Sequence, residues 1–405
     1  MIKNKYKKIV SAMLLMTMIA TTCSTNVFAG GGASAVTANQ GNNDSTGQTP
    51  TTLPSGTDVN GSGNNIINGS NNIIINQIQA PISTKESTDE KEGHLVIGKE
   101  IENKKIEDIV SIPKDEIKSI TIKNCVTSIC ESAFQGCTEL TSVTIGNGVT
   151  RIGSSAFKGC TELTSINIPN SVTYIGDGAF SGCTGLTSVT IGNSVKEIGE
   201  EAFSGCTGLE EITIPNSVTK IDKDAFKGCN GLRNVNIGKQ AVQSFRNVFG
   251  DLNIHNVCII NGVMSISEEA FRDCRTLETV TMSKSVKTIN DRAFMSCTRL
   301  QEVTINRNEE NVINQPIAQK VIGEMAFMGC TSLTNIEIPS SVTRIRMCAF
   351  LGCTSLQQIY IPDNVRAIDS YVFFNDRNLR DIRLPNLNIL MPDALAGIVR
   401  AEVHQ

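Results

Sequence analysis

The sequence predicts an α/β solenoid of about eleven stacked 23-residue repeats with a parallel strand ladder, preceded by a disordered linker. The first observation is self-similarity, because phenylalanine recurs at spacings of 23 residues, apart from one of 22 and one of 33. The second is that one unit has about eight apolar positions, too few to close a core unless neighbouring units stack. The recurring residues are Phe134, Phe157, Phe180, Phe203, Phe226, Phe249, Phe271, Phe294, Phe327, Phe350 and Phe373.

Each repeat predicts two short strands followed by helical turns. In one copy, residues 189–191 alternate apolar and polar side chains, which is typical of a strand with one buried face. Gly192 ends this strand, and Val195 and Ile198 begin a second inward-facing edge. Residues 199–206 lack β-branched side chains and are expected to form about two helical turns. Strands one repeat apart then pair in parallel, about 4.8 Å apart.

Around each phenylalanine lies the pattern Ala-Phe-x-Gly-Cys-x-x-Leu-x-x-Val/Ile-x-Ile-Pro/Gly-x-x-Val-x-x-Ile. This pattern resembles the bacterial BspA-type leucine-rich repeat, a 23-residue class found in secreted and surface proteins, over about residues 95–390. The resemblance implies a non-enzymatic protein that binds other proteins. Its associated functions are coaggregation and adhesion to host extracellular-matrix proteins such as fibronectin and fibrinogen. The motif itself specifies core packing, so it predicts the fold rather than the ligand.

Residues 1–29 have the order of a secretory signal peptide. Four lysines precede an apolar run from Ile9 to Ala20, which is too short to span a membrane, and a cleavage site follows Ala29. An alternative uses Cys23 as a lipid-modified N-terminus, although the residues before it match a lipoprotein signal poorly. The sequence therefore predicts a secreted or cell-surface protein with no membrane insertion after signal removal.

The mature chain divides into a linker, a repeat domain and a cap. Residues 30–92 are rich in Gly, Asn, Ser and Thr and predict a disordered spacer, although their Asn/Ile stretch could instead form a sticky strand. We expect the repeat domain to cover residues 93–390, with a first strand at Ile120–Ile122 and residues 93–118 covering that end. Residues 391–405 are expected to cap the other end, with a helix over Pro392–Val403.

Three places depart from the repeat pattern. The repeat around Phe249 is degenerate, a polar ten-residue insertion lies within Asn306–Gln319, and the last repeat has Asp376 in place of the usual cysteine. The departure in the last repeat is expected, because terminal repeats cap the solenoid and therefore differ from the inner ones.

Nine cysteines share one position of the repeat. Stacked neighbours at that position are too far apart, with aligned side chains, to form disulfides, so we expect buried, reduced thiols. Pairing of Cys125 with Cys130, or of Cys348 with Cys353, stays open. The nine residues are Cys137, Cys160, Cys183, Cys206, Cys229, Cys274, Cys297, Cys330 and Cys353.

The sequence gives little support for catalysis, a metal or a cofactor. His255 and Cys258 are the one Cys/His neighbour pair, and we expect Cys258 to face inward in the degenerate repeat. One thiol per turn does not make a metal cluster, and the glycines mark turns rather than a phosphate-binding loop. The net charge of −4, which becomes more negative without the four N-terminal lysines, does not indicate nucleic-acid binding.

The outward face of the strand ladder is the candidate protein-binding surface. Its N-terminal half is a neutral stripe of hydroxyl and amide side chains, whereas its C-terminal half combines an aromatic residue with charges, a composition favoured at interfaces. Repeat counting places Ile259 among the outward positions. The candidate binding residues are Glu337, Tyr360, Arg383, Asp381, Gln358 and Tyr371.

These observations predict a secreted or surface-displayed, non-enzymatic protein that binds other proteins. Adhesion to host matrix proteins or to other cells is the function that the resemblance favours. The alternative is a structural component of the cell envelope that self-associates, by stacking end to end or through the Asn/Ile stretch.

Overall fold

The fold is a parallel β-solenoid with little helix, which confirms the predicted repeat architecture. The computed structural model describes residues 94–97, 113–250, 252–306, 320–385, 387–398 and 401–404, all within one compact unit, residues 63–405. The predicted signal peptide and the whole of the predicted linker, residues 30–92, lie outside the described residues. No helix in these ranges is long and apolar enough to cross a membrane.

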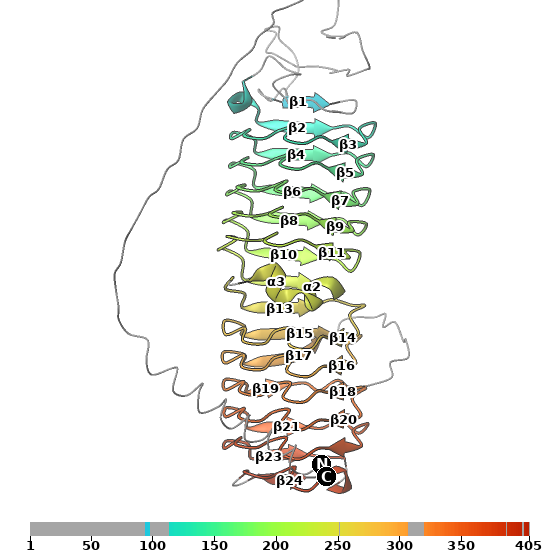
Figure 1. Cartoon of the computed structure of the whole chain (residues 1–405), viewed down its shortest axis with the longest axis vertical. Coiled ribbons are helices and arrows are strands. Elements are labelled where there is room, and N and C mark those ends of the chain that lie inside the picture. The colour runs from blue at the N-terminus through green and yellow to red at the C-terminus, as the bar shows by residue number, and fades with distance from the viewer. Residues whose placement is uncertain are drawn as a thin grey trace, which may run out of the picture. The chain divides into compact units, whose positions relative to one another are not determined.

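The first strand of each repeat builds a ladder along the length of the solenoid (Figure 1). Pairing is parallel and in register, so that Ile120 lies opposite Val143 and Val235 opposite Val257. The ladder comprises four hydrogen-bonded sheets, in the orders β1-β2-β4, β6-β8, β10-β12-β13-β15-β17-β19 and β21-β23-β24. Its strands are β1 (His94–Ile97), β2 (Ser119–Ile122), β4 (Ser142–Ile145), β6 (Ser165–Ile168), β8 (Ser188–Ile191), β10 (Glu211–Ile214), β12 (Asn234–Ile237), β13 (Asn256–Ile259), β15 (Thr279–Ser283), β17 (Glu302–Asn306), β19 (Asn335–Ile336), β21 (Gln358–Tyr360), β23 (Asp381–Arg383) and β24 (Glu402–His404).

A second ladder of two-residue strands follows the turn after each first strand. It is divided into two sheets by the degenerate repeat, where the short helices α2 (Lys239–Gln243) and α3 (Phe245–Phe249) replace a strand. The helical turns η2 (Lys114–Glu116) and η3 (Leu387–Ile389) lie near the two ends. The two sheets contain β3 (Ser128–Ile129), β5 (Arg151–Ile152), β7 (Tyr174–Ile175), β9 (Glu197–Ile198) and β11 (Lys220–Ile221), then β14 (Ser265–Ile266), β16 (Thr288–Ile289), β18 (Val321–Ile322), β20 (Arg344–Ile345) and β22 (Ala367–Ile368).

The helical turns expected on the third side of each repeat are wrong. Residues 200–205 form turns whose backbone bonds to the next repeat: Phe203 N–H donates to the Ala225 carbonyl (2.8 Å) and Gly205 N–H to that of Lys227 (2.7 Å). Glu201 and Gly205 have φ of 54° and 72°, which interrupts any right-handed helix. Bonds between repeats satisfy these donors, whereas a six-residue helix would not repay its nucleation cost.

The core is a column of stacked phenylalanine rings. The eleven recurring side chains are buried, and neighbouring ring centroids lie 4.9–5.7 Å apart except across the degenerate repeat. There Phe245 of α3 lies between Phe249 (4.9 Å) and Phe271 (4.6 Å), with tilted rings. Phe245 therefore connects the two halves of the column.

Both ends continue the strand ladder. The predicted first strand is β2, and β1 adds a strand before it, with Leu95 opposite Ile120. At the other end the predicted capping helix over Pro392–Val403 is wrong, because β24 pairs in parallel with β23 and Val403 lies opposite Ile382. β24 adds one more strand to the ladder. Its pairing satisfies the backbone N–H and C=O groups on the outer edge of β23, which a helix at this place would leave without partners.

Asp376 occupies the cysteine position of the last repeat and is completely buried. Neither of its carboxyl oxygens forms a hydrogen bond of normal geometry with another described residue. Burial raises the pKa of Asp376 well above its usual value, and the backbone amides of Cys353 and Gly352 oppose this only in part. The carboxyl group is therefore protonated in the folded protein over a pH range in which it ionises in the unfolded chain.

We expect Phe245→Ala to lower the free energy of unfolding by about 3–5 kcal/mol, because it leaves a cavity between the two halves of the ring column. Chemical denaturation measures the effect, with the exposed Gln243→Ala on α2 as the control. An equally small effect of both substitutions would contradict the bridging role of Phe245.

We expect the free energy of unfolding to fall as the pH rises from about 4 towards the raised pKa of Asp376, because the folded state binds a proton that the unfolded state has released. The slope from this one group is at most about 1.4 kcal/mol per pH unit. Denaturation over this pH range should show a flatter dependence for Asp376→Asn than for the wild type. Parallel curves for the two proteins would exclude the effect.

Candidate functional site

A groove of about 760 Å³ opens on the outward face of the first ladder, beside β19 and β21. Its floor is apolar, formed by Ile336, Ile338 and Ile359, which are 3–7% exposed, together with the half-buried Ile305. The remaining lining residues are Lys284, Asn335, Glu337, Ser340, Gln358, Tyr360, Pro362, Asp363, Asn364, Asp381 and Arg383.

The groove exists because neighbouring strands diverge there. β15 and β17 pair over five residues, whereas β17 and β19 pair over only two, and β21 belongs to a different hydrogen-bonded sheet. Glu337 N–H still donates to the Val303 carbonyl (2.7 Å), but Ile305 N–H donates to Glu337 Oε2 (2.8 Å). A carboxylate thus replaces the next ladder bond, close to where the chain leaves the repeat for the insertion.

The rim of the groove carries an exposed aromatic ring beside a guanidinium group. Tyr360 is 59% exposed and lies opposite Arg383 in the β21–β23 pairing. Arg383 Nε lies 3.4 Å from Asp381 Oδ2, and 67% of the Arg383 side chain is exposed. An exposed ion pair of this kind contributes little to stability, so the Arg383 side chain can leave Asp381 to contact a partner, beside the exposed Tyr360 ring. His404 Nε2 lies 3.9 Å from the other oxygen of Asp381.

The structure brings five of the six predicted binding residues together. Glu337, Gln358, Tyr360, Asp381 and Arg383 all line the groove. Tyr371 does not: it lies on the turn side, where its ring packs edge-on against Phe374.

The strand pattern of the sequence does not reveal the lining residues beyond the strands. Lys284, Ser340, Pro362, Asp363 and Asn364 come from the turns that follow β15, β19 and β21. A proline follows two of these strands in the sequence, Pro339 after β19 and Pro362 after β21, and each proline indicates a turn there.

The assignment of Ile259 to the outward face is wrong by one residue. Cys258 lies opposite Asn236 and Thr281 on that face, whereas Ile259 is buried. The same finding corrects the expected inward position of Cys258. The cause is the 22-residue spacing of the degenerate repeat, which shifts the count while the ladder keeps its register.

Comparison with known proteins identifies the repeat itself. The profile of the BspA type leucine rich repeat region, with six copies, matches residues 112–233, 196–317 and 311–397. The chain belongs to the BspA-type leucine-rich repeat family. No curated protein matches it.

Several solved structures are similar to this BspA-type protein. A leucine-rich repeat protein from Bacteroides ovatus is 27% identical, covering 68% of this chain and 74% of that one, with a TM-score of 0.40. A leucine rich cell surface protein from Faecalibacterium prausnitzii is 30% identical, covering 71% and 82%, with a TM-score of 0.29. The pneumococcal vaccine antigen PcpA is 17% identical, covering 85% and 99%, with a TM-score of 0.32.

The cysteines of the BspA-type repeat pack as small apolar residues, and the predicted buried thiols are confirmed at eight of the nine positions. Cys274 is the half-buried exception, and the described cysteines form no disulfide with one another, which includes the two pairs left open. Seven of these nine cysteine thiols each donate a hydrogen bond to the backbone carbonyl of the recurring phenylalanine in the previous repeat, at 3.0–3.3 Å. Cys183, for example, donates to Phe157 rather than to Phe180 of its own repeat. Burial raises the pKa of Cys297 and Cys353 well above its usual value, so the unreactive thiol form persists.

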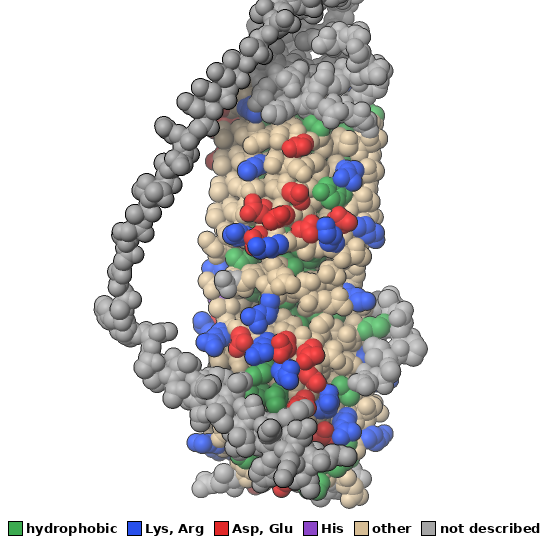
Figure 2. All heavy atoms as spheres, viewed as in Figure 1, with side chains coloured by type: hydrophobic (Ala, Val, Ile, Leu, Met, Phe, Trp, Pro, Cys, Tyr) green, Lys and Arg blue, Asp and Glu red, His purple; other side chains and the backbone are tan. Residues whose placement is uncertain are grey.

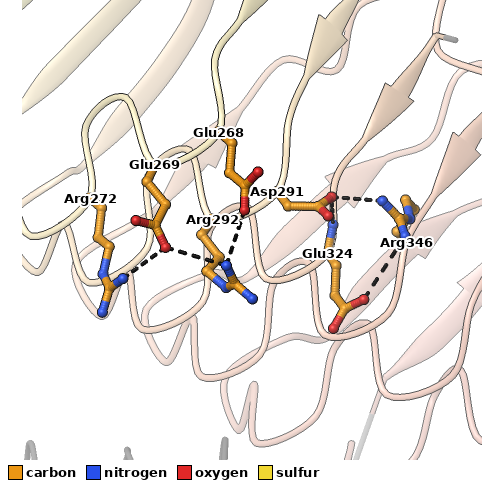
Figure 3. A network of polar contacts seen from close by, with 7 residues as sticks. All are labelled: Glu268, Glu269, Arg272, Asp291, Arg292, Glu324 and Arg346. Carbon is orange, nitrogen blue, oxygen red and sulfur yellow. Dashed lines mark hydrogen bonds and ion pairs between the residues drawn. The ribbon is translucent and has the colours of Figure 1, made fainter. Parts of the chain in front are cut away.

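Two clusters of ion pairs connect neighbouring BspA-type repeats, and one of them spans the insertion (Figure 3). Asp291 Oδ1 accepts hydrogen bonds from Arg346 (2.8 Å) and from the backbone N–H of Glu324 (2.8 Å), so it joins repeats on both sides of the inserted residues. Arg292 and Arg272 share Glu269 at 3.3 and 2.8 Å. Each cation has its carboxylate, which indicates a structural role.

The described part of the chain has no further cluster of charged or metal-ligating side chains that indicates a second site. Acidic and basic side chains are interspersed on the face shown in Figure 2. His255 Nδ1 lies 3.9 Å from Glu278, which also pairs with Arg299 at 3.1 Å. No group of three His, Cys, Asp or Glu in the described ranges could hold a metal ion.

We expect thiol labelling of the native protein at neutral pH to modify the exposed Cys125 and to leave the buried ladder cysteines unmodified until denaturant is added. Mass spectrometry of the labelled peptides identifies the sites. Rapid native labelling of Cys183 or Cys206 would show that the cysteine column opens to solvent, and would contradict the buried, unreactive thiols.

Proposed function

We propose that the protein is a secreted or surface-displayed, non-enzymatic binding protein that contacts host extracellular-matrix proteins or other cells through the groove beside β19 and β21. The observation that carries the proposal is the exposed Tyr360 next to Arg383 above an apolar floor. Tyrosine and arginine dominate the binding energy of many protein interfaces when they flank a site that excludes water.

Membership of the BspA-type family supports a protein-binding role, because proteins built from this repeat typically bind rather than catalyse. Export rests on the sequence of residues 1–29, with cleavage after Ala29.

We expect the purified protein to bind at least one of immobilised fibronectin, fibrinogen, laminin and collagen saturably. The double variant Tyr360→Ala/Arg383→Ala should bind at least about tenfold more weakly, because each substitution removes an exposed anchor. Surface plasmon resonance measures both affinities. The matched control is Asn167→Ala/Thr190→Ala, two paired outward residues of β6 and β8, and it should bind like the wild type.

Equal binding by both double variants would place the site elsewhere on the solenoid. Failure to bind any of the four proteins would overturn adhesion to host matrix.

A further inference from the structure

We propose that the same groove receives the Asn/Ile segment, residues 64–78, of a second copy of this chain, so that copies join head to tail. This interaction needs no host protein, and it therefore stands or falls separately from the proposed adhesion.

The chemistry of the segment fits the groove. Residues 64–78 contain six isoleucines among asparagines, and residues 60–80 carry no charged side chain. The floor of the groove is itself isoleucine, and amide side chains such as Gln358 and Asn364 stand at its edge. In an extended chain Ile73 and Ile75 point to one side, so both can reach the floor while neighbouring amides meet the rim.

The electrostatics of the groove favour a neutral occupant. The groove is lined by charges of both signs, with Lys284 and Arg383 against Glu337, Asp363 and Asp381, so neither sign dominates it. A segment with a strong charge of either sign would face side chains of like charge, whereas an uncharged segment would not. Two further grooves on the outward face of the described strands, beside β8 and β10 and beside β6 and β8, are lined mainly by hydroxyl, amide and carboxylate groups.

The length of the connection selects a second copy over the same copy. β1 and β21 are eleven strand spacings apart in the ladder, which is about 53 Å at 4.8 Å each. The 18 residues from 76 to 93, which connect Ile75 to β1, span about 60 Å when fully extended, and a flexible chain of that length averages about 23 Å. The segment of one copy would therefore have to stretch this connection to most of its full length to reach its own groove, which costs conformational entropy, whereas the groove of a neighbour has no such requirement.

The contact joins two different surfaces, a segment of one copy and a groove of the next. Such a heterologous contact leaves a free groove at one end of the pair and a free segment at the other. Association therefore continues beyond the dimer as the concentration rises.

Sedimentation velocity of the mature chain over a concentration series tests the proposal. We expect the weight-average sedimentation coefficient to rise with concentration for the wild type. It should stay at the monomer value for the segment variant Ile73→Ser/Ile74→Ser/Ile75→Ser and for the groove variant Tyr360→Ala. Thr190→Ala, at an outward position of β8, is the control and should associate like the wild type.

Mixing the two defective variants gives the decisive result. The segment variant retains an intact groove and the Tyr360→Ala protein an intact segment, so an equimolar mixture should form dimers and nothing larger. A monomeric wild type, continued association of the segment variant, or a mixture that stays monomeric would each overturn the proposal.

Discussion

In-register stacking of identical side chains is the constraint on which the whole structure depends. Parallel pairing sets neighbouring repeats about 4.8 Å apart, so each inward position must hold a side chain that packs against a copy of itself. Phenylalanine rings stacked at 4.9–5.7 Å meet this requirement, and so do columns of leucine, isoleucine and cysteine. The same spacing lets the backbone of the turn side bond from repeat to repeat, which removes the need for a helix there.

The features that suggest a function arise where this constraint is relaxed. The degenerate repeat replaces a strand with two short helices, and Phe245 restores contact between the two stacks of rings. The ladder diverges between β17 and β19, and the Glu337 carboxylate accepts the Ile305 N–H in place of the next ladder bond. The groove with the apolar floor lies at that divergence, whereas the grooves beside β6 and β8 and beside β8 and β10 have mainly polar linings.

One groove serves both proposed interactions. Its aromatic and charged rim suits a foreign protein, and its isoleucine floor suits the uncharged segment of another copy. The two proposed interactions therefore compete for one surface, and the concentration of the protein relative to that of the foreign partner would set the balance between them.

The sequence by itself determined the repeat, its strands and its buried positions, because these follow from local alternation and from the 23-residue period. It also placed Glu337, Tyr360 and Arg383 on successive repeats, and the ladder makes them neighbours. Only the tertiary structure decided that residues 200–205 form turns and that residues 402–404 form a strand, because both depend on hydrogen bonds to other repeats. It likewise separated Tyr371 from the groove and turned Cys258 outward, since sequence spacing does not reveal how a 22-residue repeat keeps its register.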